Sequence, residues 1–299
     1  AYDIKDGKLL STQSVLGGSY TVYASSKNII TASLSGGDGK LQVTRFSLNG
    51  GDITLEAAGE LEGELLNQFS IDEYKEHFRF VLTDNRGEYS SNSLVILDGN
   101  LKKTGAISGI AEDERVYSVR FMGDTAYFVT FRQVDPLFSV DVSDPTSPKI
   151  IGSLKIPGFS NYLFPFGKGM LFGMGQNADE KTGRSTGMKI SMFDISDPSN
   201  VTECAKTNIS ASYSDALYSH KATLINSGKN IIGFSAYGWQ NNILYFIYAY
   251  ENGELVKKAE INLPHSNTGC RGLYSGDKFY VVTPDVVYCF TLDGFKELS

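Results

Sequence analysis

Apolar and polar positions alternate in short runs along most of this chain, and turns rich in Asp, Asn, Gly or Pro separate the runs. Residues 140–154, VDVSDPTSPKIIGSL, show the pattern, and FDISDPSNVTECAKT repeats it from residue 193. Alternation with a period of two is typical of a β-strand, and Asp followed by Pro or Gly is typical of a tight turn. We therefore predict a β-hairpin in each copy, with the shared Asp-x-Ser-Asp-Pro serving as its turn rather than as a catalytic motif.

This hairpin recurs seven times, at intervals of 41 to 55 residues. Its turn residues are Asp6, Asn49, Asp98, Asp144, Asp197, Asn252 and Asp293. A second kind of hairpin, with a tight turn of Gly or Asn beside Lys or Asp, lies between successive copies and occurs six times. Together the two hairpins make a repeating unit of four antiparallel strands, and no segment shows the apolar stripe of a helix.

Four-stranded antiparallel units at this period predict an all-β fold, a β-propeller built from blades. Residues 1–16 have no hairpin before them, so they either close the ring against the last blade or are the remnant of an upstream blade. We favour a single domain over residues 1–299 with six blades, and seven blades is the alternative. The expected blades cover about 17–62, 63–108, 109–156, 157–209, 210–263 and 264–299.

The net charge and the length of the apolar stretches limit the classes of partner that we expect for this chain. The chain has 299 residues, a formal net charge of -7 and a pI near 5.1, which disfavours nucleic acid and anionic membranes as partners. We expect a monomer without a transmembrane segment, since the longest apolar stretch, ILYFIYAY from residue 243, is far too short to span a bilayer. Residues 1–10 lack the features of an export signal, which we expect either to be absent or to have been removed.

No cofactor or metal site is expected. The three cysteines, Cys204, Cys270 and Cys289, have no metal-binding spacing and are interpreted as free, buried or half-buried side chains. The GGDG stretch at residues 36–39 is interpreted as a turn, with weak Ca²⁺ binding as the alternative.

Residues 117–163, together with LLNQFSIDEY from residue 65 and SDALYSHKA from residue 214, resemble a known protein family. It comprises secreted or membrane-anchored bacterial and archaeal proteins with a C-terminal β-propeller distantly related to WD40 repeats. The resemblance runs from residue 2 to the end and implies an extracytoplasmic location, with no established activity. Where relatives would have a His after Tyr-Leu, this chain has Phe164 and Pro165, so a polar or metal role at that position is not carried over.

In a propeller, the connections from the second to the third strand of a blade, and from one blade to the next, share one face. In this chain those connections are the longer and more polar ones, and we predict that they form the functional face. The candidate ligand-binding residues are Gln68, Tyr117, Arg132, Gln133, Asp135, Tyr162, His220, Trp239 and Arg271, with Tyr20 at the corresponding position of the first blade. The alternative is that they only satisfy neighbouring backbone groups, and for Trp239 that it covers the edge of its blade.

These residues favour a non-enzymatic, extracytoplasmic module that binds a protein, a peptide or a glycan. One alternative is a glycan-active hydrolase or lyase using carboxylates such as Asp135, Asp179, Glu180 or Asp215 in a central funnel. Another is a structural surface spacer. No catalytic residue is assigned, because the sequence contains no nucleophile elbow or phosphate-binding loop, and its three histidines belong to different blades.

Overall fold

The computed structural model describes residues 1–14, 20–36, 39–131, 135–179, 182, 184–211, 213–238, 243–263 and 269–298. Over these ranges six antiparallel sheets follow one another, and the helical segments are three short 3-10 turns. None of these helical segments is long and apolar enough to cross a membrane. The all-β prediction is therefore confirmed.

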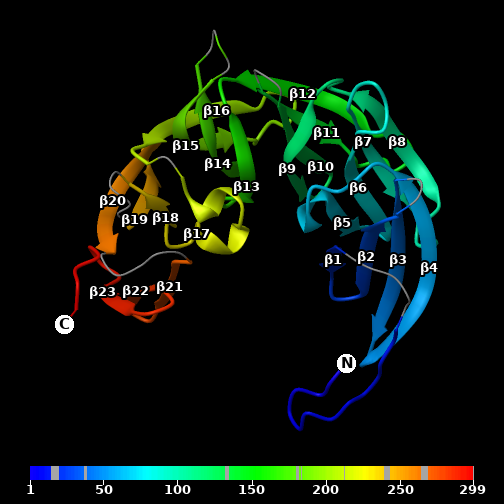
Figure 1. Ribbon diagram of the computed structural model, residues 1–299, viewed down its shortest axis with the longest axis horizontal. Coiled ribbons are helices and arrows are strands. Elements are labelled where there is room, and N and C mark those ends of the chain that lie inside the picture. The colour runs from blue at the N-terminus through cyan, green and yellow to red at the C-terminus, as the bar shows by residue number, and fades with distance from the viewer. Residues whose placement is uncertain are drawn as a thin grey trace. The chain divides into compact units, whose positions relative to one another are not determined.

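The chain divides into two compact units, called unit 1 (Ala1–Arg132 with Phe138–Ile151) and unit 2 (Gln133–Leu137 with Gly152–Ser299). Each sheet is called a blade and has its strands in chain order (Figure 1). The first three blades contain β1 (Thr21–Ala24), β2 (Asn28–Leu34), β3 (Lys40–Asn49), β4 (Asp52–Glu62), β5 (Ile71–Tyr74), β6 (His77–Asp84), β7 (Ser91–Leu97), β8 (Lys103–Ile110), β9 (Arg115–Met122), β10 (Thr125–Phe131), β11 (Asp135–Asp141) and β12 (Lys149–Ile156).

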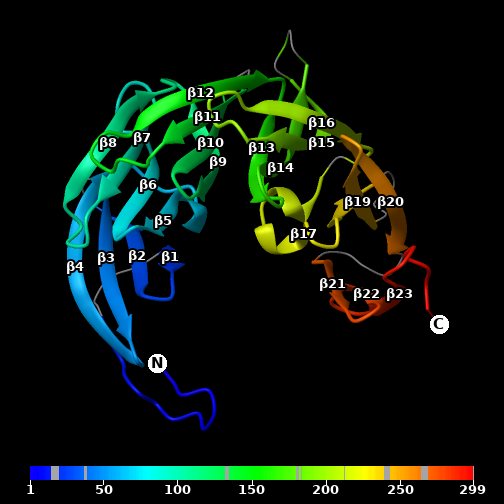
Figure 2. The same cartoon turned by 180° about the vertical axis from the view of Figure 1, so that it is seen from behind.

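The fourth and fifth blades again have four strands each, whereas three strands are described for the sixth (Figure 2). The strands are β13 (Phe159–Pro165), β14 (Met170–Ala178), β15 (Ser185–Asp194), β16 (Thr202–Ile209), β17 (Thr223–Asn226), β18 (Ile231–Tyr237), β19 (Ile243–Glu251), β20 (Glu254–Leu263), β21 (Arg271–Ser275), β22 (Lys278–Val282) and β23 (Val287–Thr291). Beyond β23 the chain folds back, and Glu297 forms an isolated bridge to Phe290. Six described sheets agree with the preferred count of six blades.

Within each unit, the described hydrophobic cores lie between neighbouring blades, because both faces of a blade are apolar. On β6, Phe80 and Leu82 belong to the core shared with the first blade, and Val81 belongs to the core shared with the third. In unit 2, Phe246 on β19 faces the fourth blade while Tyr245 and Ile247 face the sixth. Alternate side chains of a strand point to opposite faces of its sheet, so an uninterrupted apolar run lets one strand serve two cores.

The Asp-x-Ser-Asp-Pro motif is a turn, as predicted. The Asp144 carboxylate accepts hydrogen bonds from the backbone N–H of Thr146 at 2.9 Å and from its hydroxyl at 2.7 Å. Asp197 accepts the same two bonds from Ser199, at 2.9 and 2.7 Å. These bonds hold the pKa of both carboxyls below its usual value, which fits carboxylates occupied by their own turns.

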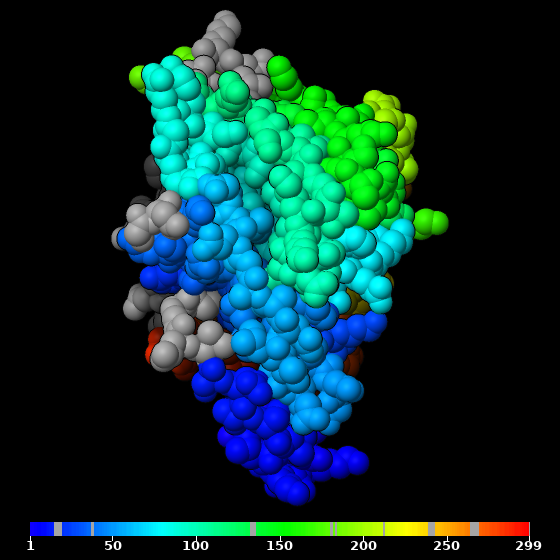
Figure 3. Space-filling view, turned by 90° about the vertical axis from the view of Figure 1, so that its right-hand side faces the viewer, coloured from blue at the N-terminus to red at the C-terminus, as the bar shows by residue number. Residues whose placement is uncertain are grey.

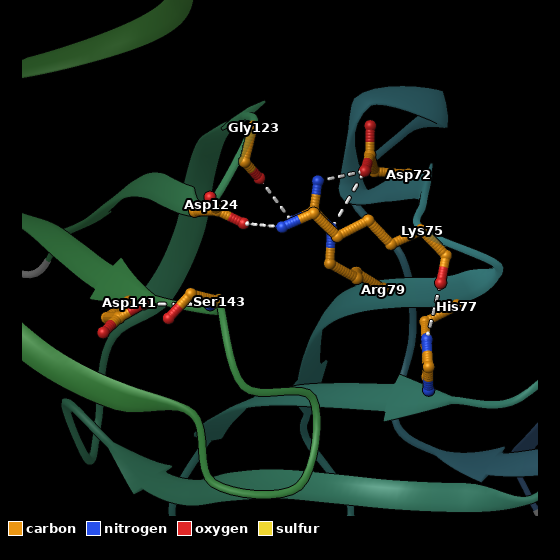
Figure 4. Close-up of polar contacts among 8 residues, drawn as sticks. All are labelled: Asp72, Lys75, His77, Arg79, Gly123, Asp124, Asp141 and Ser143. Carbon is orange, nitrogen blue, oxygen red and sulfur yellow. Dashed lines mark hydrogen bonds and ion pairs between the residues drawn. The ribbon is translucent and has the colours of Figure 1, made fainter.

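A buried arginine links two blades of unit 1 (Figure 4). Arg79 on β6 is only 2% exposed, and its guanidinium donates to the Asp72 carboxylate and to the carbonyl oxygen of Gly123, the latter at 2.6 Å. It also lies 4.6 Å from the ring centre of Tyr74 and 4.9 Å from that of Phe121. Gly123 and Phe121 belong to the third blade, so one side chain joins the second blade to the third.

The first residues of the chain form a small hairpin beside the turn between β3 and β4. In Figure 3 these residues are the darkest blue atoms at the lower end of the view. Tyr2 bridges to Leu9, and the Ser11 hydroxyl donates to the carbonyl oxygen of Gly51 at 2.7 Å. Tyr2 is 66% exposed, so the hairpin buries little apolar surface within unit 1.

Candidate functional site

In unit 2, the connection before β17 folds into two short 3-10 turns, η2 (Asp215–Leu217) and η3 (His220–Ala222). Ser214 starts η2: its hydroxyl accepts from the N–H of Ala216 at 3.0 Å and donates to the carbonyl oxygen of Ser235. Ala216 and Leu217 are buried beneath the turn. The buried residues and the hydrogen bonds of Ser214 therefore fix this segment to the core, and its tyrosines lie on the solvent side.

Three tyrosines gather above this anchor, and we call them the tyrosine surface: Tyr213, Tyr218 and Tyr237. The rings of Tyr213 and Tyr218 are stacked, with centres 5.7 Å apart and planes 23° from parallel. The ring of Tyr237, at the end of β18, lies 5.3 Å from that of Tyr213, and the two backbones pair in an isolated bridge. Tyr213 is 41% exposed and Tyr218 66%, so the stacked pair presents an accessible aromatic face.

Asp215 supplies the charge of this surface. Its Oδ2 accepts a hydrogen bond from the N–H of Gly269 at 3.2 Å, and no described cation lies within ion-pair distance of it. Burial raises the pKa of Tyr213 and of Tyr237, and the nearby Asp215 carboxylate raises it further. Both phenols are therefore neutral near pH 7, and each can donate a hydrogen bond.

Three of the residues proposed from the sequence lie around the tyrosine surface. The Tyr162 hydroxyl, on β13, donates to the carbonyl oxygen of Tyr218 at 2.9 Å, and its ring centre is 6.5 Å from that of His220. His220 begins η3, which packs against β21. Arg271 begins β21, and its guanidinium donates to the carbonyl oxygen of Cys270 at 2.9 Å.

The other proposed residues lie elsewhere or are not described. Gln68, in the 3-10 turn η1 (Gln68–Ser70), and Tyr117, on β9, line two separate pockets of unit 1, of about 290 and 340 Å³. Arg132, Gln133 and Trp239 lie outside the described residues, as does part of the GGDG stretch. Asp135, expected in a loop, is instead the first residue of β11.

Sequence reasoning included Asp215 only as a funnel carboxylate and missed the three tyrosines. The available signal was the density of aromatic residues in YSDALY at residues 213–218, inside a polar connection. The contribution of Tyr237 could not be read from the sequence, because it depends on a bridge between residues that are distant along the chain. In the described ranges, no group of three or more His, Cys, Asp or Glu residues is arranged to hold a metal ion.

A larger groove, of about 910 Å³, lies at the opposite ends of the strands of the fifth blade. Its apolar floor includes Ile231 and Ile247, and its rim carries three lysines and three acidic residues. Lys258 on this rim is paired with Glu251 at 2.7 Å. Because the charges of the rim balance, they favour neither an anionic nor a cationic ligand.

The chain resembles known proteins over nearly its whole length. The family described as "Beta propeller domain" matches residues 1–295. An uncharacterized protein of Archaeoglobus fulgidus is 34% identical over 261 residues, which cover 87% of this chain and 38% of that protein. An uncharacterized protein of Methanocaldococcus jannaschii is 35% identical over 226 residues, which cover 75% of this chain and 34% of that protein. The chain thus spans little more than a third of the length of these relatives.

Solved structures share the fold at low sequence identity. The periplasmic gluconolactonase of Pseudomonas aeruginosa has a TM-score of 0.61 at 11% identity, covering 100% of this chain and 90% of that one. A putative 6-phosphogluconolactonase of Bacteroides fragilis has a TM-score of 0.59 at 12% identity, covering 99% of this chain and 87% of that one. At these identities the likeness concerns the arrangement of the chain alone.

Proposed function

The chain belongs to the β-propeller domain family, and we propose that it is a non-enzymatic module that binds a glycan. Because propellers serve many unrelated functions, the proposal rests on the chain's own residues and not on the fold. The observation that carries this proposal is the tyrosine surface. It combines an exposed, stacked pair of rings with a carboxylate that no described cation neutralises.

A sugar ring suits this surface for two reasons. Its C–H face is apolar and can lie flat against the exposed ring of Tyr218, as aromatic side chains pack against apolar groups. Its hydroxyl groups can donate hydrogen bonds to Asp215 and accept one from a neutral tyrosine. These bonds replace the hydrogen bonds to water that the same polar groups lose when the sugar binds. The rings of Tyr213 and Tyr218 are exposed, which favours a sugar residue of a glycan chain over a small metabolite that would be buried on binding.

A glycan array provides the test. We expect the wild-type chain to bind at least one class of glycan, and Tyr218→Ala to weaken that binding about tenfold, since the stacking face is lost. Tyr218 is 66% exposed, so its removal should leave the fold intact. Isothermal titration calorimetry with the array hit measures the change.

Tyr89→Ala is the matched control, because Tyr89 is 60% exposed, belongs to unit 1 and is not one of the residues of the tyrosine surface. It should bind like the wild type. An array without a hit would overturn the proposal, and so would equal affinities for wild type and Tyr218→Ala. A protein or peptide partner would then be the remaining binding function.

A second candidate is hydrolysis of a sugar-derived lactone. Two proteins whose solved structures share the fold are a gluconolactonase and a putative 6-phosphogluconolactonase. Asp215 and His220 provide an acid and a base group within one short segment. Under the binding proposal, the chain should not accelerate the hydrolysis of glucono-δ-lactone or 6-phosphogluconolactone in a pH-stat assay. Acceleration that disappears in Asp215→Asn would favour the enzyme instead.

A further inference from the structure

One pocket of unit 1 has the features of a small-molecule binding site. In unit 1, the segment after β4 meets the end of β6 and the start of β9 around a pocket of about 340 Å³. Leu65, Val116 and Tyr117 are among the residues that line it. Glu64, Asn85 and Arg115 contribute the polar groups. The volume is near the lower end of the roughly 300–1,000 Å³ found for small-molecule sites.

The three polar residues form a connected set. Asn85 donates from its amide nitrogen to Glu64 Oε1, and Arg115 donates from Nε to Asn85 Oδ1 at 3.2 Å. A second guanidinium nitrogen of Arg115 lies 3.7 Å from Glu64 Oε1. The side chains of Arg115 and Glu64 remain 62% and 43% exposed, so each keeps unused hydrogen-bonding capacity toward the pocket or the solvent.

A buried network fixes the backbone behind the pocket. The Thr83 hydroxyl donates to Asn92 Oδ1 at 2.7 Å and accepts from the N–H of Val116 at 3.3 Å. The fully buried Asn92 side chain donates to the carbonyl oxygens of Ile110 and Glu114, at 3.0 and 3.1 Å. Since these bonds join β6, β7 and the chain entering β9, the pocket is held in shape before any ligand arrives.

We propose that this pocket is a second ligand site, specific for a neutral sugar residue. The positive charge of Arg115 and the negative charge of Glu64 balance, so neither an anionic nor a cationic ligand gains net attraction. Donors and acceptors stand side by side, as adjacent sugar hydroxyls require, and the Tyr117 ring offers an apolar wall for the C–H face. The site is distinct from the tyrosine surface and does not depend on it.

Saturation-transfer NMR with methyl glycosides of glucose, galactose, mannose and N-acetylglucosamine tests this proposal. The measurement uses a Tyr213→Ala/Tyr218→Ala background, so that the tyrosine surface cannot contribute the signal. At least one methyl glycoside should receive saturation in that background. Adding Arg115→Ala, or Tyr117→Ala, should weaken its binding about tenfold, while Tyr117→Phe, which keeps the ring, should retain most of it.

Arg184→Ala is the matched control, since Arg184 is an exposed arginine of unit 2, and it should leave the signal unchanged. The proposal is overturned if no glycoside receives saturation in the double-variant background, or if Arg115→Ala binds as well as its parent. Preference for methyl glucuronide over the neutral glycosides would also overturn it, because the ligand would then be anionic. If no glycoside receives saturation but the glycan array is positive, this pocket is not a sugar site, while the proposal for the tyrosine surface is unaffected.

Discussion

Arg79→Met is expected to lower the free energy of unfolding by about 3 kcal/mol, which is the scale for breaking a buried ion pair from one side. The substitution keeps a long apolar side chain between Tyr74 and Phe121, so the loss is electrostatic rather than a cavity. It leaves Asp72, whose side chain is 24% exposed, without its guanidinium partner. It also leaves the Gly123 carbonyl oxygen without the donor that reaches it from the second blade.

Chemical denaturation followed by circular dichroism measures this loss. The matched control is Arg86→Ala, which removes an arginine whose side chain is 37% exposed and which pairs with Asp84 and Glu62 at the surface. Exposed pairs contribute about 0–1 kcal/mol, so the control should unfold near the wild-type midpoint. Equal midpoints for Arg79→Met and Arg86→Ala would show that the buried arginine does not hold the two blades together.

The features that were predictable from the sequence are those fixed by local chemistry. Strand alternation and the turn residues between strands sufficed for the six sheets, because each hairpin is formed by residues close together in the chain. Asp144 and Asp197 bond to the second residue after them, so their role as turn residues needs no knowledge of the rest of the fold.

What the sequence did not reveal depends on which distant segments meet. The link from Arg79 to Gly123 spans 44 residues, and the contact between Tyr162 and Tyr218 spans 56. The repeat predicts that such segments belong to neighbouring blades, but not which side chains touch. For that reason the proposal from the sequence included Tyr162 and His220 and missed Tyr213, Tyr218 and Tyr237, which make the aromatic face.

The close contact of a glycine with the neighbouring strand is another feature that the sequence alone does not reveal. We expect Gly175→Ala to lower the free energy of unfolding by about 3 kcal/mol, the upper part of the usual range for overpacking. Gly175 on β14 pairs with Ser160 on β13, next to a bulge at which Asn161 has no partner residue. A Cβ atom on Gly175 would lie 1.8 Å from the carbonyl oxygen of Phe159. Because that oxygen belongs to the backbone, β13 itself would have to move.

The same bulge positions Tyr162, which lies two residues beyond Ser160. The Tyr162 hydroxyl donates a hydrogen bond to the carbonyl oxygen of Tyr218. Gly175→Ala should therefore both lower the thermal midpoint and weaken any ligand bound at the tyrosine surface. Gly36→Ala is the control, since a Cβ there meets nothing within 4 Å, and it should change the stability by less than about 1 kcal/mol. If both alanine variants melt together, β13 can yield at no cost, and the close approach of β14 would not be what fixes Tyr162.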